Sequence, residues 1–517
     1  MKKIFLLLLS VGLLAAKDDA GAKKPKPRFR LGKETTYVTE PLDAHGYIDY
    51  AAALHARLRR GVTPENNANV LLWKAFGPHP EGGASMPDDF FKWLGIKAPP
   101  EQGDYFISLT RFLREQRKRG PVPDANAIAE ELSRCSQPWK ASEHPNIAAW
   151  LKANEKPLAL VAKATKRTHY YSPLAPKRTK RGRSHLLDAR LPVVQKCREL
   201  TNALVARAML RLGEGRGNDA WQDLLVCHRL GRLVARGAIF IEALVGIAID
   251  AIAANADLAF LDRAQLTSEQ IKNCLRDLKK LPPMPLMVDK VDVGERFLFL
   301  DAVVMLDRDG VEALAAKASN PLAKFFQRTI NWEPALRNGN RMYDRMAKAM
   351  RGKDRDSRQK ELGQIGKDLA ELDKKIGELK PGMLKLLFAK NSDKLVGEYI
   401  GNIMIGLLTP NVSKMQNAAD RCEQIQNNLY LAFALAAYHR DHNRYPKELD
   451  ALKPKYLDNI PKDMFSGKPL IYRPTANGYL LYSVGVNGRD EQGRSYDADP
   501  RGDDLTVRMS LPKLKRK

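Results

Sequence analysis

The sequence predicts a mainly α-helical protein in which a multi-helix body is followed by a small C-terminal α+β domain. Through most of the chain, apolar residues recur every three or four positions, which is the period of an amphipathic helix. Only after about residue 470 do runs rich in β-branched and aromatic residues alternate with Asn-Gly and Gly-rich turns. At 517 residues the chain exceeds the usual limit for one hydrophobic core, so we expect two or three domains.

The N-terminus has the pattern of a secretory signal peptide. Lys2 and Lys3 precede an apolar run at residues 4–16, and a triplet of small residues follows at 20–22. The apolar run is shorter than the roughly 20 residues needed to span a bilayer. We therefore expect residues 1–22 to be a cleaved signal and the protein to be exported to the periplasm or the exterior. An uncleaved, membrane-associated anchor is the alternative.

The formal net charge of +26 favours anionic partners such as envelope polymers, lipid head groups, acidic proteins or nucleic acid. A basic lead-in at 23–40 and a basic tail at 513–517 contribute to it. The strongest basic run is a predicted loop at 163–190, where basic residues surround Tyr170 and Tyr171, a combination that can bind phosphates and stack on bases. In an exported protein we expect a solvated loop or contact with an anionic envelope polymer, rather than nucleic acid. The candidate anion-binding residues are Lys166, Arg167, Lys177, Arg178, Lys180, Arg181 and Arg183.

Residues 41–281 are predicted to form a helical domain. Two amphipathic segments on either side of the glycine-rich turn at 213–219 resemble a single tetratricopeptide-type hairpin, with the spacing Ala208, Leu212, Ala220. The following stretch, 237–261, is very apolar but carries three carboxylates, so it predicts a buried helix rather than a membrane span.

A second helical region is predicted at 286–409, after the proline-rich boundary at 282–285. Within it, apolar residues at 362–379 follow the three-four alternation of a coiled-coil seam. The pattern lasts less than three heptads and includes glycines, so we expect packing within the chain rather than a dimer seam. The sequence does not predict the oligomeric state.

The last hundred residues predict one long helix packed on a small antiparallel sheet. The helix covers Ser413 to about Asp441 and ends before Tyr445-Pro446, because proline cannot continue a helix. Strands are expected at 470–473, 478–483 and 504–509.

Several motifs follow one another in this region: Tyr445-Pro446, Leu449 and Leu452, Ile460-Pro-Lys-Asp463, the Gly467 turn, Ile471-Tyr472, Tyr482-Ser-Val-Gly485 and Asn487-Gly488. In this order they resemble the C-terminal domain of the major pseudopilin of type II secretion systems. The resemblance covers residues 410–512 alone. A pseudopilin begins with a prepilin-peptidase site and a long apolar helix, and neither precedes this module. We therefore do not expect the protein to polymerise as a pilin.

Pseudopilins of this type hold calcium in the loop before the last strand, so the resemblance implies a calcium ion in the loop at 487–504. Calcium takes oxygen ligands from carboxylates and backbone carbonyls, although the spacing here is not that of an EF-hand. The alternative is a solvated acidic loop that offsets neighbouring arginines. The expected ligands are Asp497, Asp499, Asp503 and Asp504.

The sequence contains no zinc-hydrolase helix, nucleophile elbow or phosphate loop. Glu242 and Asp250 on the apolar helix are the best candidates for carboxylates with raised pKa values, and pairing with Arg207, Arg211 or Arg229 is the ordinary alternative. The five cysteines are widely spaced, and we expect them to be buried thiols. A disulfide between Cys197 and Cys227 is the alternative, because the two would lie close together if their helices were antiparallel neighbours.

These observations favour an exported, noncatalytic envelope protein whose helical scaffold presents a pseudopilin-like interaction module to envelope proteins or anionic envelope polymers. Two alternatives stay open. One is an envelope hydrolase that uses carboxylates of the helical body, and the other is an anion- or nucleic-acid-binding protein that acts through the basic loop.

Overall fold

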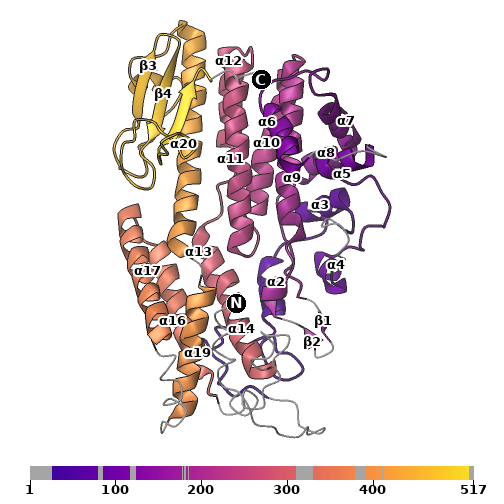
Figure 1. Ribbon diagram of the computed structural model, residues 1–517, viewed down its shortest axis with the longest axis vertical. Coiled ribbons are helices and arrows are strands. Elements are labelled where there is room, and N and C mark those ends of the chain that lie inside the picture. Colours follow the sequence, from indigo (N-terminus) through magenta and orange to yellow (C-terminus); the bar gives the residue numbers. More distant parts are fainter. Residues whose placement is uncertain are drawn as a thin grey trace.

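The computed structural model describes residues 26–79, 86–116, 124–176, 178–179, 182–183, 185–309, 330–378, 391–409 and 411–511. The described chain is mainly helical and ends in a small three-stranded antiparallel sheet, as the sequence predicts. The molecule is elongated, and its longest helices run along its length (Figure 1). The predicted signal peptide, residues 1–22, and the basic tail, residues 513–517, lie outside the described residues.

The N-terminal part consists of short helices that pack beside four longer ones. Side-chain caps begin several of them: the Asp49 carboxylate accepts a hydrogen bond from the Ala52 N–H (2.9 Å), and Thr267 and Gln270 form a capping box. The short helices are α2 (Tyr50–Leu58), α3 (Ala68–Phe76), α4 (Asp88–Leu94), α5 (Leu109–Gln116), α6 (Ala125–Arg134), α7 (Pro145–Ala153) and α8 (Glu155–Ala164). The longer ones are α9 (Pro192–Gly213), α10 (Gly217–Val234), α11 (Phe240–Arg263) and α12 (Ser268–Lys279).

Helices α9 and α10 form a hairpin across the glycine-rich turn, and α11 packs against both. Cys197 and Cys227 lie on these two neighbouring helices as free, buried thiols, so the disulfide alternative is not realised. Among the described residues, α11 is the one helix long and apolar enough to cross a membrane, and more than half of that stretch is buried within the protein.

The next part of the chain contains α13 (Met287–Asp289), the π-helix η2 (Lys290–Glu295), α14 (Arg296–Asp309), α16 (Glu333–Met350), α17 (Arg355–Glu378) and α19 (Ser392–Leu408). Helix α17 carries the heptad-like segment. Its Leu362 and Ile365 side chains are fully buried against other helices of the same chain, with Leu369 and Leu372 packed beside them. The first half of the segment therefore lies in an intramolecular core.

The C-terminal region is helix α20 (Val412–His442), the short 3-10 helix η5 (Leu449–Leu452) and strands β3 (Ile471–Thr475), β4 (Gly478–Ser483) and β5 (Leu505–Met509). The strands pair in the order β3-β4-β5, with Tyr472 opposite Leu481 and Leu481 opposite Val507. Side chains on one face of the sheet join the core beside α20, while the other face, here called the outer face, points away from α20.

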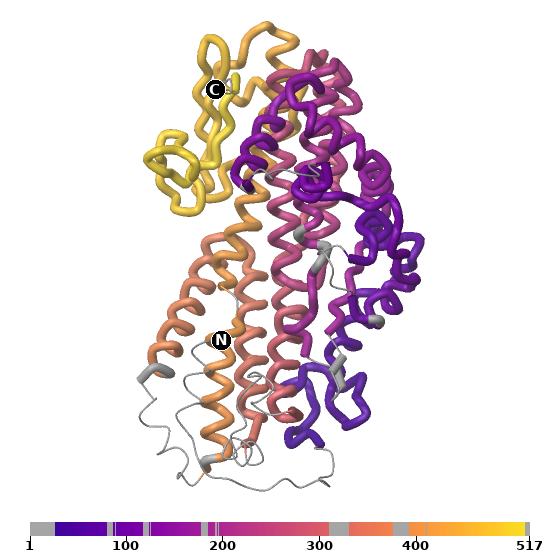
Figure 2. The backbone as a smooth tube through the Cα atoms, turned by 45° about the vertical axis from the view of Figure 1, so that its right-hand side comes forward, coloured from indigo at the N-terminus to yellow at the C-terminus, as the bar shows by residue number. Residues whose placement is uncertain are grey.

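The described residues form two large hydrophobic cores and a third, small one, and α20 takes part in both large cores. The first core contains residues of α3–α12, the second half of α20 and the sheet. The second contains residues 29–54 with α14, α16, α17, α19 and Val412 at the start of α20. The two cores therefore do not coincide with the predicted ranges 41–281 and 286–409. Helix α2 belongs to the first range by sequence, but together with the N-terminal segment it packs in the second core. Figures 1 and 2 both show α20 extending from the sheet down to the lower helices.

The aromatic contact between α20 and the body provides a test of this packing. Phe433 is fully buried, and its ring centroid lies 5.6 Å from that of Trp221 on α10. We expect Phe433→Ala to lower the free energy of unfolding by about 3–5 kcal/mol, measured by urea denaturation, because it leaves a cavity in the first core. Lys414→Ala, at an exposed position of the same helix, is expected to change it by less than about 0.5 kcal/mol. Equal effects would contradict the burial of α20 against the body.

Candidate functional site

The loop between β4 and β5, residues 484–504, carries the predicted calcium ligands. Asp504 is almost fully buried, and one of its carboxylate oxygens accepts a hydrogen bond from the Gly493 N–H (2.7 Å). Its Oδ1 atom has no hydrogen-bond partner among the described residues. Burial raises the pKa of Asp504 to about 6, and the neighbouring Glu491 and Asp490 charges also raise it.

Asp503 points to α20 instead. Its carboxylate forms an ion pair with the guanidinium of Arg421 and accepts a hydrogen bond from the Asn487 N–H (3.0 Å). The backbone N–H of Asp503 donates to Glu491 (3.0 Å). Asp503 therefore connects the two ends of the loop to the middle of α20.

The other two predicted ligands, Asp497 and Asp499, are exposed. No group of three or more His, Cys, Asp or Glu side chains in the described part of the chain lies close enough together to hold a metal ion. The four carboxylates are thus not brought together in this arrangement. Calcium binding by the loop stays a prediction.

The loop is fastened to the outer face of the sheet. The Tyr482 hydroxyl donates to Asp490 (2.9 Å), and Arg473 on β3 donates to Gln492 (2.8 Å). Gly493 has a positive φ of 77°, and a Cβ built there would lie 3.0 Å from the Leu480 side chain, so glycine allows the loop to approach the strand. The acidic loop is therefore an ordered part of the module surface.

Asp463, from one of the motifs that carry the pseudopilin resemblance, has a structural role. Its buried carboxylate accepts hydrogen bonds from the Ser483 hydroxyl (2.8 Å) and from the N–H groups of Val484 (3.1 Å) and Phe465 (2.9 Å). These bonds join the segment before β3 to the end of β4, where the acidic loop starts.

The basic run at 163–190 differs from the phosphate- and base-binding alternative. Tyr170 and Tyr171 are buried, and the Tyr171 hydroxyl shares a hydrogen bond with a ring nitrogen of His55 (3.0 Å), so neither ring can stack on a base. Arg167 donates to the backbone carbonyls of Pro64 and Asn67, both at 2.7 Å. Its role is therefore structural.

The remaining basic candidates cannot be assembled into a site. Lys166 is exposed, and residues 178–179 pair with residues 182–183 in a short ladder of strands β1 (Arg178–Thr179) and β2 (Gly182–Arg183). The side chains of the other predicted anion-binding residues lie outside the described residues: Lys177, Arg178, Lys180, Arg181 and Arg183.

A buried ionic network that the sequence did not predict joins α10, α11 and α20. His228 on α10 contacts Asp250 (2.6 Å) and Asp257 (2.8 Å) of α11, and Arg232 pairs with Asp250. The Cys422 thiol of α20 completes it, 3.6 Å from the second oxygen of Asp250. Burial lowers the pKa of His228, but the two carboxylates outweigh this effect and raise the pKa to about 9. Two positive and two negative charges thus compensate one another in the interior.

The predicted partners of Asp250 were wrong in detail. Arg207 and Arg211 both pair with Asp223, whereas Asp250 pairs with His228 and Arg232. The available signal was the spacing by whole helical turns of Asp250 and Asp257 on α11 and of His228 and Arg232 on α10. It did not specify which faces meet, because that depends on the crossing of the helices.

Glu242 lies at the N-terminus of α11, where the two cores meet. It is fully buried and accepts a hydrogen bond from the Ile239 N–H (3.3 Å), and burial raises its pKa to about 7. Beside it, Glu295 of η2 accepts from the Phe240 N–H (2.9 Å), and the buried Lys290 donates to the Gly237 carbonyl. Glu242 and Asp250 are both sealed from solvent, so a substrate cannot reach either carboxylate, as the hydrolase alternative would require.

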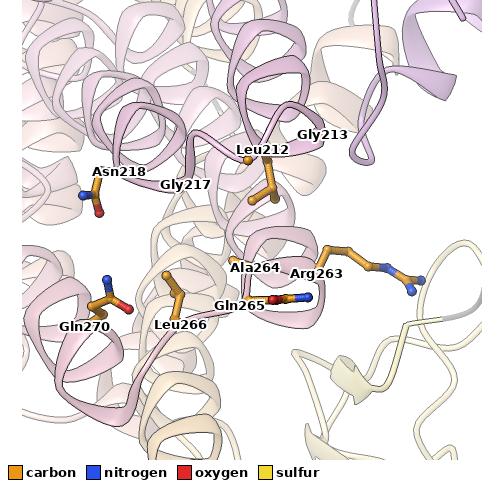
Figure 3. Close-up of a pocket in the computed structure, with 10 residues that line it drawn as sticks. Leu212, Gly213, Gly217, Asn218, Arg263, Ala264, Gln265, Leu266 and Gln270 are labelled. Atoms are coloured by element: carbon orange, nitrogen blue, oxygen red, sulfur yellow. The ribbon is translucent and has the colours of Figure 1, made fainter.

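A cavity of about 570 Å³ lies between the α9–α10 turn and the α11–α12 junction. The amide side chains of Asn218 and Gln270 lie on one side of it, and Arg263 extends on the other side (Figure 3). The Arg263 guanidinium donates a hydrogen bond to the Leu511 carbonyl (3.4 Å). Glycines 213, 215 and 217 form much of its wall. No pattern in the sequence indicated this cavity.

Comparisons with protein-family models, with curated proteins and with solved structures found no match to this chain. Interpretation of its function therefore depends on the geometry of the described residues and on the motifs in residues 410–512.

The buried network predicts a large effect of a small substitution. We expect Asp250→Asn to lower the free energy of unfolding by about 3–5 kcal/mol, because it leaves the charges of His228 and Arg232 without full compensation. Urea denaturation followed by circular dichroism measures this. Asp219→Asn, in an exposed pair with Arg216, is the matched control and should cost less than about 0.5 kcal/mol. A cost below about 1 kcal/mol for Asp250→Asn would show that the network is not formed.

The carboxylate of Glu295 predicts a pH dependence of stability. Burial raises its pKa to about 7 from an ordinary value of 4.5. Because the folded pKa is raised, its contribution to stability is fully present below about pH 4.5 and is lost as the pH rises through 7. We expect wild-type stability to fall by about 2–3 kcal/mol from pH 5 to pH 8 through this group, and Glu295→Gln to reduce the slope.

The slope should not vanish in this variant, because Glu242 and Asp301 also have pKa values raised to about 7. Urea denaturation at several pH values gives the comparison, with Glu371→Gln at an exposed position of α17 as the control. Parallel pH profiles for wild type and Glu295→Gln would contradict the assignment.

Proposed function

We propose that this is an exported, noncatalytic envelope protein in which a helical body presents a pseudopilin-like interaction module. The observation that carries the proposal is the arrangement of residues 411–511, where one long helix lies against a three-stranded antiparallel sheet in the order that the pseudopilin motifs predict. The signal-like N-terminus supports export. The high positive charge of the chain favours envelope proteins with acidic surfaces, or anionic envelope polymers, as partners.

The geometry supports a scaffold role for the body. Helix α20 packs against α11, α12 and α17, so the module is fixed rather than tethered. Helix α11 likewise covers the tetratricopeptide-like hairpin α9–α10. The covered face of the hairpin therefore packs inside the protein and does not offer a surface to a partner. Partners would then reach the module at the exposed residues of β3, Arg473, Pro474 and Thr475, and at the tip of the acidic loop, where Tyr496 is 61% exposed.

Site-specific photo-cross-linking in cells tests this proposal. We expect a photoreactive residue at Thr475 or Tyr496 to capture proteins of a secretion or pilus assembly. Lys348 is an exposed position on α16, a helix of the second core, and a photoreactive residue there should not capture these proteins. These positions leave both cores intact. Capture of the same proteins from all three positions would move the interaction into the helical body.

The same cells test export. Fractionation is expected to place the chain outside the cytoplasm, and mass spectrometry of the purified protein is expected to find a mature N-terminus after Ala16 or Ala22. A chain in the cytoplasm with an intact N-terminus would contradict the proposal.

A further inference from the structure

The ion pair between Arg421 and Asp503 joins the acidic loop to α20. It is partly buried, with the Arg421 side chain 30% exposed and the Asp503 side chain 23% exposed. The second oxygen of Asp503 accepts from the Asn487 N–H (3.0 Å), so the carboxylate is held from both sides. Charge-assisted contacts of this kind fix the position of both partners.

Two further carboxylates of the loop accept hydrogen bonds from backbone and amide donors, although the Oδ1 atom of Asp504 has no hydrogen-bond partner among the described residues. Glu491 accepts from the Asn487 side-chain amide (2.7 Å) and from the Asp503 N–H (3.0 Å), while Asp504 accepts from the Gly493 N–H (2.7 Å). These bonds point the carboxylates at separate donors rather than at one common centre. The described residues of the loop, in this arrangement, do not fit a calcium ion.

The position of Arg421 in α20 makes it more than a surface charge. The preceding residue, Asp420, is buried and faces Arg355 and Arg358 of α17, and the following residue, Cys422, contacts Asp250. Arg421 therefore extends from a turn of α20 that contacts both α17 and α11. A loop that is bonded to it is held against the body as well as against the sheet.

We propose that Arg421 supplies the positive charge that a bound cation would supply to the acidic loop, and that it clamps residues 484–504 to α20 without a metal ion. The pair neutralises Asp503 and sets the separation between the loop and the helix. The loop keeps its position on the outer face of the sheet whatever the calcium concentration. This inference is independent of whether the module binds partners.

Limited proteolysis of the full mature chain tests the clamp. Chymotrypsin cleavage after the exposed Tyr496 reports opening of the loop. We expect Arg421→Gln to raise the cleavage rate about fivefold, which is the effect of losing roughly 1 kcal/mol of local stability. Two control variants should each change the cleavage rate less than twofold. Arg421→Lys keeps the positive charge, and Arg489→Gln removes an arginine of the same loop that has no ion pair with a described residue.

The metal dependence separates the clamp from a calcium site. The wild-type chain is expected to give the same cleavage rate and the same midpoint of thermal unfolding in excess EGTA and in millimolar calcium chloride. Protection of the wild-type loop by calcium, or a cleavage rate of Arg421→Gln equal to that of the wild type, would overturn the proposal.

If Arg421→Gln disturbs α20 as a whole, cleavage will appear throughout the chain. Asp503→Asn then gives the test, because it leaves α20 unchanged and keeps an acceptor for the Asn487 N–H. We expect a rise in cleavage confined to the loop, and no rise would equally overturn the proposal.

Discussion

The middle of α20 is the constraint on which the rest of the structure depends. Within about two turns of this helix, Asp420 faces the arginines of α17, Cys422 contacts Asp250 of α11, and the Gln424 side chain accepts from the Met464 N–H (2.7 Å). One turn further, Asn428 donates to the Leu505 carbonyl at the start of β5 (2.8 Å). Polar side chains on different faces of one helix thus join the lower helices, the helical body and the sheet. At a rise of 1.5 Å per residue, α20 is about 46 Å long, which is enough to pass through both cores.

This arrangement explains why the interior contains so many ionisable groups. Three helices that meet through polar faces must compensate each charge locally, since an unpaired buried charge costs several kcal/mol. The network of His228, Arg232, Asp250 and Asp257 satisfies this condition with balanced charges. Pairing raises the pKa of His228 and lowers the pKa of Asp250, whereas burial raises the pKa of Asp257. The sealing of these groups from solvent keeps a substrate from reaching them.

Sequence reasoning was most successful where a single element determines its own pattern. The apolar period at Met415, Cys422, Leu429 and Ala436 predicted the long helix, and β-branched and aromatic runs predicted the strands to within two residues. It was less successful for contacts between distant segments. Residues 29–54 join the second core, and Tyr170 and Tyr171 turn inward, because tertiary packing rather than local composition decides which face of an aromatic-rich segment is covered.

The site illustrates the same limit. The motifs identified the acidic loop and its place before the last strand, but they did not include Arg421, which lies 82 residues before its partner in the chain. A carboxylate-rich loop has the same composition whether a metal ion or an arginine neutralises it. Which of the two is present depends on what the packing of α20 brings to the loop. In this chain, Asp420 pairs with arginines of α17 and Cys422 contacts Asp250 of α11, and these buried contacts orient α20 so that Arg421 faces the loop. The same contacts fix the module on the body. The fixing of the module and the proposed clamp on its acidic loop therefore have a common physical origin.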